Sequence, residues 1–303
     1  MASAPASDIF IGKELPEKEP RMPVRQPCAR QFYAGDCKAQ IESFRKGFKP
    51  PDSPGRVVAG IVPHAGWFFS GATAAKVFLT IQAAGRPDVF ILFGAVHMPG
   101  VWRNSIYDSG SWETPFGPID VAEDTADALI LKMGDILAPD TSAHRDEHSI
   151  EVQTAMIKYI FPDARIAPIA VPPGRDAVRL GAGIGRLIKK EKMDAVVVGT
   201  SDLTHYGDSY GFSPAGYGRQ GYEWMVANDR KIIDLALALK PDDILREAAA
   251  HRNACGAGAM AAAVAAAREM GAEKGRLLEH TTSYDVYPQG EFDMGVGYAA
   301  IVF

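Results

Sequence analysis

The chain has 303 residues, of which 47% are hydrophobic and 23% charged, which is the balance of a globular protein large enough to bury a sizeable core. Its net charge of −5 and the lack of any Lys/Arg block argue against a nucleic-acid partner, which would favour a basic surface. No apolar run reaches the ~18 residues of a membrane span, and no signal peptide is evident, so no membrane partner is expected.

Residues 1–24 are rich in Pro, Glu and Ser and predict a loosely ordered lead-in, followed by a single domain over residues 25–303. In that domain, short apolar runs typical of buried strands alternate with longer helical patterns. Residues 101–120 interrupt the alternation with two Trp and two Pro, which favours a hairpin-like insertion. We expect strands at 56–62, 88–93, 164–171, 194–199 and 295–303, and helices at 70–84, 148–160, 175–190, 223–239 and 257–270.

Alternation of strands and helices predicts an α/β fold, a three-layer sandwich with a mostly parallel or mixed central sheet. The near-continuous apolar run at 194–199 (DAVVVG) is typical of a strand covered on both faces. No repeat or long linker divides the chain.

The cysteines are Cys28, Cys37 and Cys255, an odd and sparse set that is unlike the disulfide framework of a secreted protein. A reducing cytoplasm fits this usage. Cys28 and Cys37 can pair in principle, but two free thiols are the simpler expectation.

Histidines follow three of the predicted strands, at the point where each strand ends. His64 follows the first strand, His97 the second, and His205 the strand at 194–199. Ligands of open α/β sheets lie outside the carboxyl ends of the strands. If the three strands are parallel neighbours, at least two of these imidazoles converge; otherwise each is an ordinary structural histidine.

Cys255 precedes an Ala-rich helical pattern. A thiolate at a helix start is favoured by the helix dipole and can act as a metal ligand or nucleophile. The alternative is a small buried apolar residue. Imidazole together with thiolate suits iron, copper or zinc, and three protein ligands leave open positions for a reactant.

Three further groups can contribute to the same cleft. Asp146 and Glu147 at a helix start are usually caps, whereas His148 can enter the cleft as a donor or proton carrier. Asp202, three residues before His205, can hold that histidine in one tautomer as a general base; the alternative is an Asx-type turn beside a surface histidine. No phosphate-binding loop pattern appears, so a nucleotide cofactor is not expected.

Six segments, in order, resemble the Memo family, whose bacterial and archaeal members are often labelled AmmeMemoRadiSam system protein B. The most specific is VPHAGWFFSG at 62–71, which is similar to the family's PHAGYxYSG signature. The others are 25–36 (compare RxPAVAGxFYP), 93–97 (LGPSHH), DEHSIEVQ at 146–153, 201–207 (SSDFxHYG) and the CG step at 255–256.

The resemblance implies a fold similar to that of the class III extradiol dioxygenases, which are non-haem iron enzymes. It implies that His64 and His97 are metal ligands, with Cys255 in the place of a carboxylate ligand. His205 falls where the dioxygenases carry an acid/base histidine, and Asp202 belongs to the same motif. His148 is implied to lie near the cleft.

The chain departs from the family pattern at several positions. Met98 replaces the second histidine of LGPSHH, Ala95 and Val96 replace its Pro-Ser, and Trp67 replaces the tyrosine of PHAGY. These changes keep the implied ligands but make the pocket more apolar.

Three functions are consistent with these residues. The first is a metal-dependent redox enzyme with Fe²⁺, or alternatively copper or zinc, on His64, His97 and Cys255, acting on a small organic molecule. The second is a non-catalytic module that binds a peptide side chain or sequesters metal. The third is a zinc-dependent hydrolase. The sequence carries no expectation about the oligomeric state.

Overall fold

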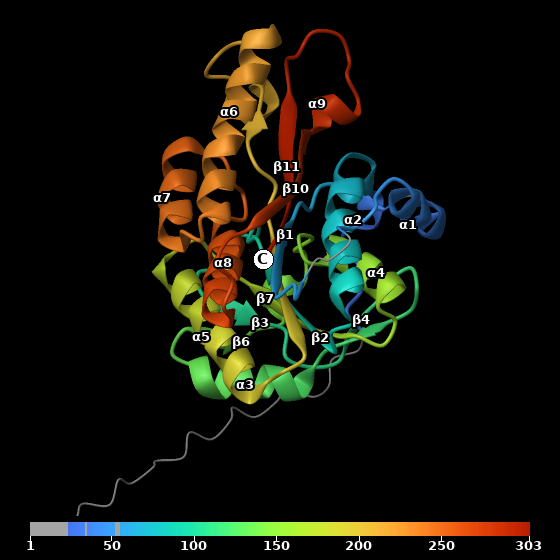
Figure 1. Ribbon diagram of the computed structural model, residues 1–303, viewed down its shortest axis with the longest axis vertical. Coiled ribbons are helices and arrows are strands. Elements are labelled where there is room, and N and C mark those ends of the chain that lie inside the picture. Colours follow the sequence, from blue (N-terminus) through green and yellow to red (C-terminus); the bar gives the residue numbers. More distant parts are fainter. Residues whose placement is uncertain (1–23, 34, 52–54) are drawn as a thin grey trace, which may run out of the picture.

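The computed structural model describes residues 24–33, 35–51 and 55–303, and its centre is a sheet with the strand order β10-β11-β1-β8-β2-β7-β3-β6 (Figure 1). The four central strands run parallel. Their residues are almost all buried, as the apolar runs predict. These strands are β1 (Ala59–Val62), β8 (Ala195–Thr200), β2 (Val89–Gly94) and β7 (Arg165–Ala170).

Antiparallel strands flank this centre on both sides, so the sheet is mixed. The last strand of the chain, β11, lies antiparallel between β1 and β10, and β3 lies antiparallel to β7. The short β9 pairs with the start of β11. The bounds are β3 (Asn104–Ile106), β6 (Leu137–Pro139), β9 (His205–Tyr206), β10 (Arg276–Thr282) and β11 (Gly295–Val302).

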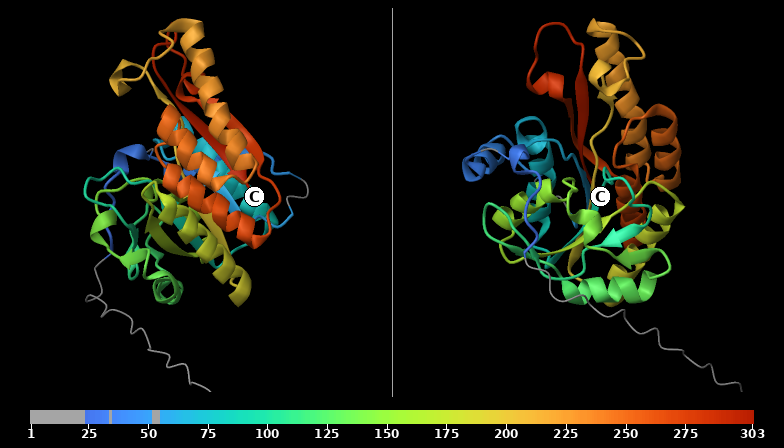
Figure 2. Two further views of the ribbon diagram at one scale, coloured as in Figure 1. Left: turned by 90° about the vertical axis from the view of Figure 1, so that its left-hand side faces the viewer. Right: turned by 180° about the vertical axis from the view of Figure 1, so that it is seen from behind.

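Helices cover both faces of the sheet, because successive strand residues point to opposite faces and both sets are apolar. One face packs against α1 (Cys37–Lys46), α2 (Trp67–Ala84) and α4 (Glu151–Ile160). The other packs against α3 (Glu123–Met133), α5 (Arg175–Glu191), α6 (Gly218–Leu237), α7 (Pro241–His251) and α8 (Ala257–Met270). Figure 2 shows these two groups from the side and from behind, with β10, β11 and α6 extending past the body.

The α5–α8 pair packs unusually closely, because small residues form the contact. A side chain at Gly181 would collide with the backbone of Ala262, and one at Gly185 would collide with the backbone of Ala266. The Ala-rich sequence of α8 therefore reflects packing of one backbone against another. Buried on all sides between α5 and the sheet, α8 holds the loop that carries Cys255 in a fixed place.

The predicted three-layer α/β sandwich with a mixed central sheet is confirmed. The expected strands and helices are present with ends that differ by a few residues; the predicted 223–239 helix, for example, starts at Gly218 and ends at Leu237. The insertion at 101–120 contains the hairpin of β4 (Ser111–Trp112) and β5 (Ile119–Asp120). The predicted lead-in falls almost wholly on residues 1–23, outside the described residues.

Some elements were not predicted from the sequence, among them α1, α3, β6, α7, β10 and the short α9 (Ser283–Val286). Helix α7 begins with Pro-Asp-Asp, a sequence that is also typical of a loop. Here it forms the start of a helix, with Pro241 at N1 and two acidic residues near the positive end of the helix dipole. Strand β10 is only partly buried and lacks an apolar run. No helix in the described parts of the chain is long and apolar enough to cross a bilayer.

Candidate metal centre

The strand order brings three chemically important loops to one edge of the sheet. Strands β1, β8 and β2 are parallel neighbours, and their register aligns Gly60, Val198 and Leu92, so the three strands end level. The loop after β1 carries His64 and the loop after β2 carries His97. The condition for convergence of these histidines is therefore met.

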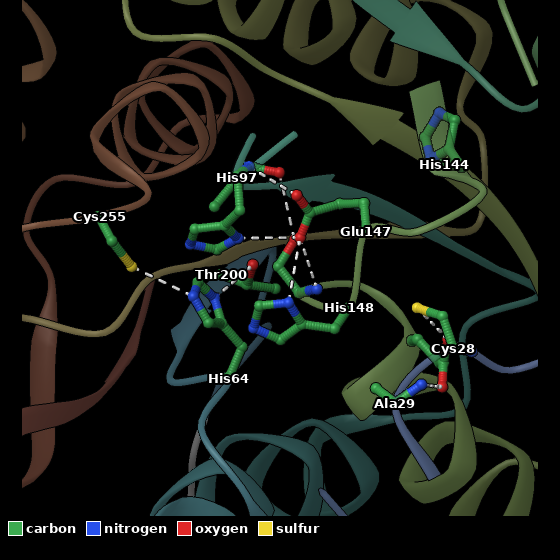
Figure 3. Close-up of polar contacts among 12 residues, drawn as sticks. Cys28, Ala29, His64, His97, His144, Glu147, His148, Thr200 and Cys255 are labelled. Carbon is green, nitrogen blue, oxygen red and sulfur yellow. Dashed lines mark hydrogen bonds and ion pairs between the residues drawn. The ribbon is translucent and has the colours of Figure 1, made fainter. Parts of the chain in front are cut away.

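His64, His97 and Cys255 lie together at this edge, with one potential ligand atom of each within 4.8 Å of the others. The Cys255 Sγ is 3.1 Å from the Nε2 of His64. The two imidazole rings are 5.2 Å apart and nearly perpendicular. Figure 3 shows the thiol and the His97 ring on the same side of His64. Residues 191 positions apart thus form one compact group of nitrogen and sulfur donors.

The His64 side chain is buried and fixed from the strand next to it. Its Nδ1 lies 3.1 Å from the Thr200 hydroxyl, which leaves Nε2 turned toward the thiol. Burial, together with the nearby His97 and His148, holds the pKa of His64 well below its usual value. A neutral imidazole with a fixed tautomer is the form that binds a metal.

His97 is fixed by Glu147, a buried carboxylate. The Nδ1 of His97 lies 3.0 Å from Oε1 of Glu147, and its backbone amide donates to Oε2 at 2.7 Å. Burial opposes charge on both groups, but their mutual hydrogen bond prevails: the pKa of His97 is raised and that of Glu147 is lowered to about 2. A carboxylate behind a histidine is a frequent arrangement in metal sites, where it orients the ring and raises its basicity.

Glu147 was expected to be a helix cap, and it does accept a hydrogen bond from the amide of Ser149. Its bonds to His97 were not predicted. A second group of possible ligands consists of His97, Glu147 and His148. Because Glu147 already holds the ring and backbone of His97, its position is that of a supporting group for a ligand.

Cys255 lies in the loop before α8 and is tied to the loop after β8. Its backbone amide donates to the carbonyl of Asp202 at 3.2 Å, and the next amide, of Gly256, donates to the hydroxyl of Ser201 at 2.9 Å. Burial and the negative charge of Asp202 raise the pKa of the thiol. The thiol therefore favours its protonated form until a cation stabilises the thiolate.

Asp202 lies at the same edge of the sheet, but its hydrogen bonds differ from the expectation. Its Oδ1 accepts from the backbone amides of His64 at 2.7 Å and Ala65 at 3.2 Å. The His205 ring is instead oriented by the carbonyl of Leu203, to which Nδ1 donates at 3.1 Å. Burial raises the pKa of Asp202, and the charge of His205 opposes that rise, so the two groups are electrostatically close.

His148 also lies at the centre, where it is stacked between two rings. Its ring lies 4.8 Å from that of His97 and 4.8 Å from that of Phe32, nearly parallel to both. Burial and the neighbouring His97 lower the pKa of His148. Phe32, which the sequence did not single out, therefore forms one wall of the centre.

Residues 25–33, here called the N-terminal strap, bring Phe32 to the centre. The strap is anchored on Glu151 in the first turn of α4: Arg25 forms an ion pair with it at 2.8 Å, and the amides of Cys28 and Ala29 donate to it at 2.8 and 2.9 Å. The Tyr33 hydroxyl donates to it as well, at 3.1 Å. Among the described residues, Cys28, Cys37 and Cys255 form no disulfide, as expected.

Comparison with known proteins identifies the family. A family model described as "Memo-like protein" matches residues 27–302. The chain belongs to the Memo family. A MEMO1 family protein of Thermococcus onnurineus is 35% identical over 295 residues, covering 92% of this chain and 99% of the relative. MEMO1 family proteins of Pyrococcus furiosus and Aeropyrum pernix are 33% and 34% identical, with 92% of this chain covered in each case.

Among solved structures, an uncharacterized protein from Escherichia coli K12 superimposes with a TM-score of 0.49 at 12% identity, covering 82% of this chain and 100% of that chain.

Within this Memo-family chain, the donor set itself fits a transition metal. Two imidazoles with tied Nδ1 atoms and one half-buried thiol suit iron, copper or zinc.

Proposed function

We propose that this Memo-family protein holds a transition metal, Fe²⁺ in the first instance, on His64, His97 and Cys255, and that it acts on a small organic molecule in redox chemistry. The observation that carries the proposal is the convergence of three donor atoms within 4.8 Å from three separate loops. Each histidine is held through Nδ1 by a second residue, Thr200 or Glu147. Such support is typical of ligands that must keep their geometry.

The metal would supply a Lewis-acidic, redox-active centre with positions open to a substrate. The chain's own residues supply the rest. Nδ1 of His205 donates to a carbonyl, so its Nε2 is unprotonated in the neutral ring and can accept a proton. His148, kept neutral by burial and stacked on His97, can donate or relay a proton at the same face. The buried Asp202 supplies negative charge beside His205 and holds the His64 loop.

Metal analysis after anaerobic reconstitution tests this proposal. Protein loaded separately with Fe²⁺, Cu⁺ and Zn²⁺ should retain about one ion per chain, and His64→Ala, His97→Ala and Cys255→Ser should each lose it. Cys28→Ser and His251→Ala are matched controls outside the ligand set and should retain the ion. Oxygen uptake that depends on an added phenol would support redox turnover. Wild-type protein that retains no ion, or a Cys255→Ser variant with unchanged stoichiometry, would overturn the ligand assignment.

A second candidate is a non-catalytic module that binds a peptide side chain, and one observation favours it. Directly after the His64 loop, α2 exposes Phe68 and Phe69, and Phe68 contacts the exposed Tyr287 from beyond α9. Exposed aromatic side chains that cluster together are a feature of binding surfaces. Metal retention without turnover on any phenol would favour this candidate.

Retention of zinc in preference to iron, with ester hydrolysis, would favour a zinc-dependent hydrolase on the same ligands. The odd and sparse set of three cysteines supports a reducing location such as the cytoplasm.

A further inference from the structure

The segment that follows His205 folds back over that histidine. It forms a short 3-10 turn, Asp208–Tyr210, between two glycines in the left-handed region, Gly207 and Gly211. The turn places the Tyr210 ring 5.0 Å from the His205 ring, nearly perpendicular to it. The expected proton carrier of the centre is thus covered by an aromatic side chain that is itself 37% exposed.

Arg252 holds this turn from the far side. Its guanidinium donates to the carbonyls of Tyr210 at 3.2 Å and Gly211 at 3.3 Å and lies 4.5 Å from the centre of the Phe212 ring. These contacts join the turn to the loop between α7 and α8, in which Cys255 lies three residues after Arg252.

The backbone at Arg252 is held in a conformation that such a residue rarely adopts. It ends α7 with φ of 53°. A non-glycine residue in this region costs about 1 kcal/mol or more, and such residues cluster where a site needs a fixed geometry. The conformation orients the guanidinium toward the turn at 208–212.

The turn is also braced within itself, so that its shape is defined. The hydroxyls of Tyr217 and Ser213 both donate to the carboxylate of Asp208, at 2.7 and 3.0 Å. Tyr210 therefore sits on a turn held at two points, by Asp208 and by Arg252.

The Tyr210 hydroxyl remains available. Among the described residues, none forms a hydrogen bond with it. Partial burial and the negative charge of Asp202 raise the pKa of Tyr210, so the phenol stays protonated at neutral pH and acts as a donor. A half-exposed donor beside a proton acceptor, and within reach of the Asp202 charge, is suited to an oxygen atom of a bound molecule.

We propose that Tyr210 is a substrate-contacting residue, whose hydroxyl donates a hydrogen bond to an oxygen of the molecule bound beside His205, and that Arg252 is the positioning residue that holds it there. The substrate class is a small organic molecule that presents an oxygen acceptor between Tyr210 and the centre. This inference rests on the proposed function, because it presumes that a substrate binds at the metal centre.

The placement of Tyr210 over His205 by Arg252 can be tested in the metal-free protein by NMR of its seven histidines. The His205 ring signal, assigned by its loss in His205→Gln, carries a ring-current shift from Tyr210. The shift should survive in Tyr210→Phe, which keeps the ring, and collapse in both Tyr210→Ala and Arg252→Ala. Arg246→Ala, on the exposed face of the same helix, should leave it unchanged. An unaltered His205 signal in Arg252→Ala would overturn the role of Arg252.

The substrate contact can be tested with 4-nitrocatechol, an oxygen-bearing anionic chromophore, added anaerobically to iron-loaded protein. Tyr210→Phe should weaken its binding about fivefold, the effect of one lost hydrogen bond, with metal content unchanged. Tyr222→Phe, which loses a hydrogen bond to Asp285 outside the centre, is the control. Unchanged affinity in Tyr210→Phe, with metal and probe bound as in wild type, overturns this inference alone. Wild-type protein that takes up no metal overturns the proposed function with it.

Discussion

The carboxylate of Asp202 accepts a hydrogen bond of 2.7 Å from the backbone amide of His64, so the loop after β8 holds the loop after β1. The backbone carbonyl of Asp202 also accepts from the amide of Cys255. One residue therefore joins two of the three segments that would ligate a metal. Its position explains why a charged side chain is retained in buried surroundings: the groups that surround it are polar amides of the site itself.

We expect Asp202→Ala to weaken metal binding at least tenfold, because the His64 loop loses its anchor. The free energy of unfolding should fall by about 2 kcal/mol, since buried amides of His64 and Ala65 lose their acceptor. Asp202→Asn keeps an oxygen acceptor and should recover most of both losses. Chelator competition measures the affinity and urea unfolding the stability. Wild-type affinity in Asp202→Ala would show that the loop keeps its shape without this carboxylate.

A second prediction concerns the carboxylate behind His97. Glu147→Gln replaces a charged acceptor by a neutral one, which lowers the basicity of the ring and should reduce metal affinity about 10- to 100-fold. Isothermal titration under anaerobic conditions measures the change. The control is Asp120→Asn, at an exposed carboxylate on β5. Equal affinities in the two variants would remove Glu147 from the metal centre.

The N-terminal strap should depend on its buried ion pair. Arg25→Ala leaves the Glu151 carboxylate buried without its cation and should lower the free energy of unfolding by about 3 kcal/mol. Trp67 fluorescence should change as well, because Tyr33 of the strap packs against that indole at 5.4 Å. Arg45→Ala breaks an exposed pair with Glu42 and should cost less than about 0.5 kcal/mol. Similar urea midpoints for the two variants would contradict the anchoring role.

Stability should fall with acidification because of His144. Burial lowers the pKa of His144 to about 4, and the nearby Arg25 adds to this effect, while its Nε2–H bond to the Ser105 carbonyl opposes it. Between the ordinary pKa near 6.5 and pH 4, the unfolded chain binds a proton that the folded chain does not. The contribution of neutral His144 to the free energy of unfolding is therefore full above pH 6.5. It is lost as the pH falls through this window, by about 3 kcal/mol in total.

The measurement is a series of urea unfolding curves from pH 7 to pH 4, in wild type and in His144→Gln. The variant has no titrating ring, so its stability should vary less over the same range. Parallel curves for the two proteins would mean that other groups carry the acid dependence.

Packing of α5 on α8 gives a matched pair of glycine substitutions. Gly181→Ala places a methyl group against the backbone of Ala262, which cannot move aside, and should cost about 3 kcal/mol. Gly183→Ala meets only the flexible side chain of Met133, and the higher helix propensity of alanine offsets the contact. Thermal melts should therefore separate two variants of identical chemistry. A melt of Gly181→Ala close to wild type would show that the helices can separate.

The parallel centre of the fold could be predicted because its strands carry uninterrupted apolar runs, as at 194–199. Strand β10 and helix α7 could not, because the partly buried β10 has a mixed composition and the Pro-Asp-Asp of α7 resembles a turn. The ends of the strands, and with them His64 and His97, followed from the same apolar runs.

The supporting residues of the centre were harder to predict. Thr200 lies within a buried strand, and Phe32 lies far from the centre in the sequence; neither has a local pattern that marks its contact. Asp202 was singled out for its spacing from His205, but its hydrogen bonds go to amides 138 and 137 residues away. Spacing along the chain gives no information about a partner that only the tertiary fold provides.

The position of β8 between β1 and β2 has a consequence for biosynthesis. Strand β2 is made about 100 residues before β8 and β1 about 130 residues before it, yet each pairs with β8 in the finished sheet. Until residues 195–200 are made, both strands have an unpaired edge that is rich in Val, Ile and Phe, the type of surface that associates with other chains. The nascent protein must therefore be shielded, by chaperones or by transient pairing, over the roughly 100 residues of synthesis between β2 and β8. Conditions that slow elongation in this interval should increase aggregation more than a delay of equal length after β8.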